Sequence, residues 1–122
     1  MKLFVLLSMI FCHVADDYYL QGILASMKQK SWWQLNAPDK LYEHDYIMAL
    51  VMHAFSWSFM IMLPVAVILH FEVSTGYLVL FVVNWVAHAI VDDMKANKKC
   101  IDLITDQCFH MMQIVCTWMA FV

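Results

Sequence analysis

Arginine is absent from this sequence, and glycine and proline occur only twice each. So few turn-forming residues, together with apolar runs that lack strict alternation, argue against a β-barrel. The lysines form no basic patch, so we expect no nucleic-acid binding. No C-x-x-C spacing occurs, and we interpret the cysteines as small buried apolar residues: Cys12, Cys100, Cys108 and Cys116.

Apolar residues are what the chain has in excess. They make up 64% of its 122 residues, well above the ~45–50% of soluble domains, and the mean hydropathy is +0.69. A hydrocarbon core of ~30 Å requires about 20 helical residues. Four segments reach this length: residues 3–27, 45–71, 76–94 and 101–122. The sequence therefore predicts an all-α integral membrane four-helix bundle, one domain over residues 1–122, with an interfacial loop between the first two helices.

The lysines predict the orientation of this bundle. The loops 28–44 and 95–100 lie on the same side of a four-pass protein and hold Lys28, Lys30, Lys40, Lys95, Lys98 and Lys99. By the positive-inside rule both loops are cytoplasmic and both termini face outward, in a bacterial inner membrane. The start, MKLFVLLSMIF, is similar to a secretory signal, but Phe11 and His13 stand where small residues are needed. We expect it to be retained as the first membrane helix.

Ionisable residues within the apolar segments follow a regular pattern. Three His/Asp pairs, each four residues apart and so on one helix face, come from three segments: His13 and Asp17, His88 and Asp92, Asp106 and His110. The second segment adds His53. At 1.5 Å per residue all seven fall in the cytoplasmic half of the bundle, unlike His44 and His70. We interpret Asp16, Asp93 and Asp102, which lie off the shared faces, as solvated helix ends or supporting groups.

The cost of burying these carboxylates indicates a bound cation. Each carboxylate near the middle of a membrane helix costs ~2.5–3.5 kcal/mol, and no lysine lies deep within a segment. Imidazole and carboxylate groups together suit zinc, manganese or iron. We therefore predict one or two divalent metal ions, held by His13, Asp17, His53, His88, Asp92, Asp106 and His110. Protons, water, or hydrogen bonds between helices without metal are the alternatives.

Seven ligands exceed the four of a tetrahedral zinc and suit two ions with bridging carboxylates, as in phosphoester hydrolases. In this interpretation Asp92 and Asp106 are catalytic, and Lys95 meets a phosphorylated or lipid-like substrate at the membrane surface. Gln21 and Gln107 orient ligands or water.

Other functions use the same residues. A metal-ion carrier or channel, a haem protein with paired His13 and His110, and a small membrane regulator with a purely structural metal site remain open. So does assembly into a homo-oligomer.

The ordered motifs resemble the domain of unknown function 3307 family of small bacterial and phage membrane proteins. They are H-x-x-x-D-x-x-x-Q (His13, Asp17, Gln21), a lone His53, H-x-x-x-D-x-x-K (His88, Asp92, Lys95) and D-Q-x-x-H (Asp106, Gln107, His110). The similarity covers nearly the whole chain. It implies an integral membrane protein with a polar cluster and supplies no substrate. Asp16, where the family usually has a small residue, and the loop 28–44 are particular to this chain.

Overall fold

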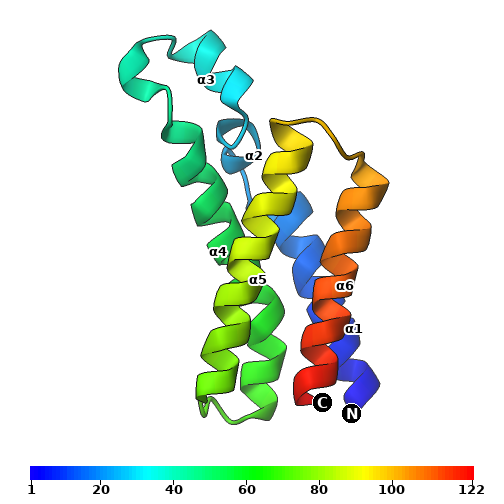
Figure 1. The fold of residues 1–122 in the computed structure, drawn as a ribbon. Coiled ribbons are helices and arrows are strands. Elements are labelled where there is room, and N and C mark those ends of the chain that lie inside the picture. Colours follow the sequence, from blue (N-terminus) through cyan, green and yellow to red (C-terminus); the bar gives the residue numbers. More distant parts are fainter.

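Four long helical segments build the protein, and no strand is present (Figure 1). The computed structural model describes residues 1–122. The segments are α1 (Lys2–Val14) with the π-helix η1 (Ala15–Leu20), α4 (Asp45–Ile68), α5 (Thr75–Ala96) and α6 (Leu103–Phe121). They alternate in direction, so both termini lie at the same end (Figure 1). α1 packs against α4 and α6, and α5 packs against α4 and α6.

Three segments are long and apolar enough to cross a membrane: Lys2–Leu20, Lys40–Ile68 and Thr75–Ala96. α6 has 19 residues, or ~28 Å of helix, but its first three turns carry Asp106, Gln107, His110 and Gln113. The prediction of an all-helical fold is confirmed, with three segments that meet the requirements for a membrane crossing.

The first segment ends earlier than residue 27. Its helix stops at Leu20, and the chain turns at Gly22, whose φ of +54° suits glycine. The last residues of the predicted segment 3–27 form a separate short helix, α2 (Leu24–Met27), and the expected loop 28–44 contains α3 (Lys30–Asn36) and the 3-10 helix η2 (Lys40–Tyr42). α2 packs against α4, so residues beyond the turn return to the long helices.

The interior is unusually polar. Nearly half of the 25 buried residues are polar or charged, whereas large apolar side chains cover much of the surface. Such an arrangement is expected where lipid surrounds the helices. The apolar core fills the half near the termini with Val5, Met9, Trp57, Ile61, Met62, Val65, Ala66, Tyr77 and Ile114. The buried charges occupy the other half.

The cysteines are free, and only Cys12 is partly buried. The expectation of buried thiols is wrong for Cys100, Cys108 and Cys116, which are exposed. Cys108 and Cys116 lie on the outer side of α6 among exposed apolar residues, and Cys100 lies in the connection between α5 and α6. Asp102, as expected, lies at a helix end. It accepts a hydrogen bond from the Thr105 backbone N–H (2.8 Å), and hydrogen bonds from Thr105 hold the pKa of Asp102 below its ordinary value.

Candidate metal centre

All seven residues singled out as ligands lie together in the interior. Their exposed fractions range from 0 to 9%: His13, Asp17, His53, His88, Asp92, Asp106 and His110. They come from η1 and all four long helices. The two other histidines in question, His44 before α4 and His70 after it, are exposed and lie elsewhere.

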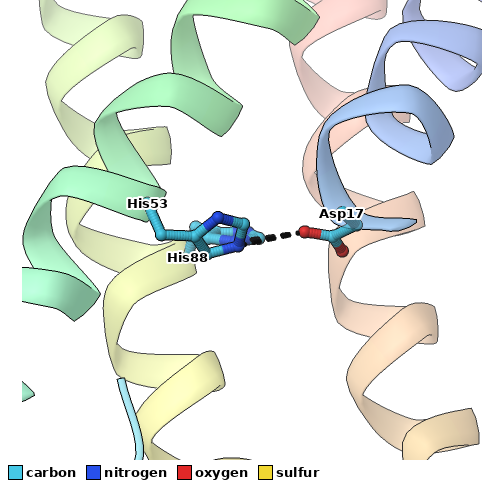
Figure 2. A group of neighbouring side chains, drawn as sticks. All are labelled: Asp17, His53 and His88. Carbon is cyan, nitrogen blue, oxygen red and sulfur yellow. Dashed lines mark hydrogen bonds and ion pairs between the residues drawn. The ribbon is translucent and has the colours of Figure 1, made fainter. Parts of the chain in front are cut away.

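Four side chains converge in a first group, three of which Figure 2 shows. His53 Nε2 lies 3.1 Å from Asp17 Oδ1, 3.2 Å from His88 Nε2 and 3.3 Å from Asp92 Oδ2. His88 Nε2 lies 3.7 Å from each of the same two carboxylate oxygens. A tetrahedral zinc with bonds of 2.0–2.1 Å separates its ligand atoms by ~3.3 Å. These five separations are close to that value, and Asp17, His53 and His88 have atoms close enough together to hold one ion.

A second group shares members with the first. His110 Nε2 lies 3.3 Å from Asp106 Oδ1 and 3.6 Å from Asp92 Oδ1, and His88, Asp92 and His110 have atoms close enough to hold one ion. Neither His110 Nε2 nor Asp106 Oδ1 has a hydrogen-bond partner within the chain. Asp92 thus faces the first group with Oδ2 and the second with Oδ1, as a bridging carboxylate does.

His13 takes part in a hydrogen-bond chain instead. Trp57 Nε1 donates to His13 Nδ1 (2.7 Å), so the ring proton resides on Nε2 and is donated to Gln107 Oε1 (2.9 Å). Gln107 Nε2 in turn donates to Asp106 Oδ2 (2.9 Å). Both nitrogens of His13 therefore have partners other than a metal. Gln107 orients Asp106, the kind of role suggested by the sequence.

Trp57 also belongs to this centre, and the residues predicted from sequence did not include it. It is fully buried and stacks on His88, with ring centroids 4.1 Å apart, while His88 stacks on His110 at 4.2 Å. Its position four residues after His53 places both on one face of α4. That spacing, and the need of a buried indole N–H for an acceptor, were the available signals.

Replacing Trp57 with phenylalanine is expected to destabilise the protein by ~1–3 kcal/mol, because His13 Nδ1 would lose its donor while an aromatic ring remains. Trp85→Phe is the matched control, since its indole donates to the Val51 carbonyl at the helix exterior. Denaturation in detergent would measure both. If both variants lose the same free energy of unfolding, the Trp57–His13 hydrogen bond contributes no more to stability than the exterior one.

The interpretation of Asp16 as a solvated helix end is wrong. It is buried at 1% exposure and accepts a hydrogen bond from Ser56 Oγ (2.6 Å). The cause is the π-helix over Ala15–Leu20, whose wider turn brings Asp16 and Asp17 inward together. Gln21 also differs from expectation, because it donates to the Asp17 backbone carbonyl rather than to the carboxylate.

Two lysines reach the centre, whereas the sequence predicted only Lys95 near it and no lysine deep among the helices. Lys28, only 8% exposed, places Nζ 2.8 Å from Asp92 Oδ2. Asn97 on the end of α5 holds this segment, donating to the Lys28 carbonyl (3.0 Å) and accepting from the Lys30 N–H (2.6 Å). Lys95 Nζ lies 3.5 Å from Asp106 Oδ2. The turn at Gly22 returns Lys28 to the interior, which helix counting did not anticipate.

Comparison with known proteins identifies a family and no characterised relative. No curated protein and no solved structure is detectably similar to the chain. The profile of one family, described as a protein of unknown function (DUF3307), matches residues 5–122. This match includes every residue of the centre, and the chain belongs to the DUF3307 family.

Proposed function

We propose that this protein binds divalent metal within its membrane-embedded helices. The observation that carries the proposal is the spacing of Asp17 Oδ1, His53 Nε2, His88 Nε2 and Asp92 Oδ2: each imidazole nitrogen lies 3.1–3.7 Å from both carboxylate oxygens, and the two nitrogens lie 3.2 Å apart. Two imidazole nitrogens that face each other and the same two carboxylate oxygens form a donor set that divalent metals prefer. A second ion would be held by Asp92, Asp106 and His110. Zinc, manganese and iron all suit these ligands.

We place the centre in the cytoplasmic half of a four-pass bundle in a bacterial inner membrane. This placement is supported by the lysines of residues 28–44 and 95–100, which flank the half that holds the charged residues. On this proposal α6 is the fourth crossing, since its polar side chains point inward to the other helices. Both termini then face outward.

The reaction we propose is metal-dependent hydrolysis of a phosphoester. Two ions joined by one carboxylate activate water and stabilise the leaving oxygen, and Asp92 has the required position between the two groups. Lys95, beside Asp106, supplies a positive charge for an anionic substrate. The carrier alternative is less well supported, because the apolar core of Trp57, Ile61, Met62 and Ile114 fills the half near the termini.

Metal titration tests the proposal directly. Protein purified in detergent, stripped with a chelator and reloaded with zinc, manganese or iron, is expected to hold one or two ions per chain by elemental analysis and to melt at a higher temperature when loaded. His70→Ala, remote from the centre, should behave like the wild type. If no metal binds in stoichiometric amounts, the centre is a hydrogen-bonded contact between helices and the proposal is wrong.

A further inference from the structure

A groove on the outer surface includes Gln107, the neighbour and hydrogen-bond partner of Asp106 in the second ligand group. It has a volume of about 460 Å³ and is lined by Tyr18, Leu103, Ile104, Gln107, Cys108 and Met111. Tyr18 contributes one wall from η1, and α6 contributes the rest. From Leu103 to Met111 the helix rises ~12 Å, which matches the depth of the headgroups and the first part of the acyl chains.

One lining residue connects the groove with the centre. Gln107 donates to Asp106 Oδ2 (2.9 Å) and so separates the groove from that carboxylate by a single side chain. Behind it, Asp106 Oδ1 and His110 Nε2 are buried without hydrogen-bond partners. The two atoms face each other as an ion pair at 3.3 Å, so a buried pair of polar groups lies behind the apolar groove.

A positive charge, the ammonium group of Lys95, lies beside the part of the groove that Gln107 lines. Lys95 Nζ lies 3.5 Å from Asp106 Oδ2, and its side chain is 36% exposed. Gln107, which lines the groove, donates to the same oxygen, Asp106 Oδ2, so the lysine lies close to the groove. An apolar channel that ends at an ammonium group is complementary to an amphiphile with an anionic head.

Resting on the proposed function, we infer that the substrate is a membrane lipid with a phosphorylated headgroup, which enters sideways from the bilayer between η1 and α6. The phosphoryl group meets Lys95 and the second ligand group. The acyl chains lie along Leu103, Ile104, Cys108 and Met111. A water-soluble phosphate ester lacks this apolar contact and binds weakly.

Lipid binding, measured separately from activity, tests the inference. Native mass spectrometry of the metal-loaded protein would be titrated with phosphatidic acid, diacylglycerol, phosphatidylcholine and glycerol phosphate. Phosphatidic acid is expected to bind best. Ile104→Trp fills the groove and should abolish this preference, whereas Met119→Trp, on the same helix and similarly exposed (70% against 74%), should keep it. Lys95→Gln should weaken the binding of phosphatidic acid about fivefold, equivalent to ~1 kcal/mol. The binding of diacylglycerol, which has no phosphate, should not change.

Two outcomes would overturn the inference: equal binding of phosphatidic acid by Ile104→Trp and Met119→Trp, or equal binding of glycerol phosphate and phosphatidic acid by the wild type. If Ile104→Trp fails to fold, Lys95→Gln provides the test. Unchanged binding of phosphatidic acid by Lys95→Gln would show that Lys95 does not recognise the phosphate. Metal content, measured on the same samples, reports on the proposed function independently. If the protein binds phosphatidic acid selectively but holds no metal, the proposed metal-dependent function is wrong and the lipid groove stands. If it holds metal but does not select phosphatidic acid, the lipid groove is wrong and the metal centre stands.

Discussion

Asp92→Asn is expected to abolish stoichiometric metal binding and to destabilise the protein by about 3–5 kcal/mol, the usual cost of breaking a buried ion pair. Asp92 faces both ligand groups, and its Oδ2 accepts from the Lys28 ammonium at 2.8 Å. The amide keeps the shape but loses the charge. Lys28 is then left buried without its counter-charge, and each ion loses a ligand. Elemental analysis and denaturation in detergent measure the two effects.

Asp93→Asn is the matched control, because it is the next residue of α5 and is only partly buried. Asp93 accepts from Asn97 (2.7 Å) and lies 3.9 Å from the exposed Lys98, and such surface pairs contribute ~0–1 kcal/mol. Full metal content should remain. Were Asp92→Asn to hold as much metal as Asp93→Asn, Asp92 could not be the bridging ligand.

Lys28→Met is expected to change stability and metal affinity in opposite directions. Without metal, Asp92 loses its closest cationic partner, and we expect a loss of about 3–5 kcal/mol. With metal, a repelling charge is gone. An ammonium and a divalent ion 4 Å apart repel by ~8 kcal/mol at an effective dielectric constant of 20. Because the lysine can move away from the ion, we expect metal to bind only about 10–100 times more tightly, or ~1.4–2.8 kcal/mol.

Lys30→Met serves as the control for this variant, since Lys30 is exposed and its ammonium lies over the Tyr46 ring, 6.0 Å from the centroid. Calorimetric titration with zinc or manganese gives the affinities, and melting of the stripped proteins gives the stabilities. An unchanged affinity in Lys28→Met would mean that the ammonium and the ion do not share Asp92. Lys28 would then be a purely structural partner.

The candidate site was largely predictable because its members repeat a helical spacing. Pairs at i and i+4, such as His88 with Asp92, share a face whatever the details of packing, and an apolar surrounding requires charged groups to meet one another. The structure brings all three pairs and His53 together. The all-helical fold followed from composition and the lengths of the apolar segments in the same way.

The departures have local causes. A periodicity of 100° per residue could not place Asp16 inside, because η1 has π rather than α geometry there. Lys28 was assigned to a loop, since nothing in the composition showed that the turn at Gly22 would fold α2 back onto α4. An indole in an apolar segment usually has a packing role, which made Trp57 a weak candidate from sequence. Its hydrogen bond to His13 and its stacking on His88 distinguish it in the structure.

The buried ion pairs do not balance the charge of the interior. Four carboxylates are buried, Asp16, Asp17, Asp92 and Asp106, and two of them pair with an ammonium group: Asp92 with the buried Lys28 and Asp106 with the partly exposed Lys95. With uncharged imidazoles, the interior therefore carries two surplus negative charges, which one divalent cation balances. A second cation would leave two surplus positive charges in a low-dielectric medium. A doubly ionised phosphate group restores neutrality, so the second ion and the substrate would be expected to arrive together.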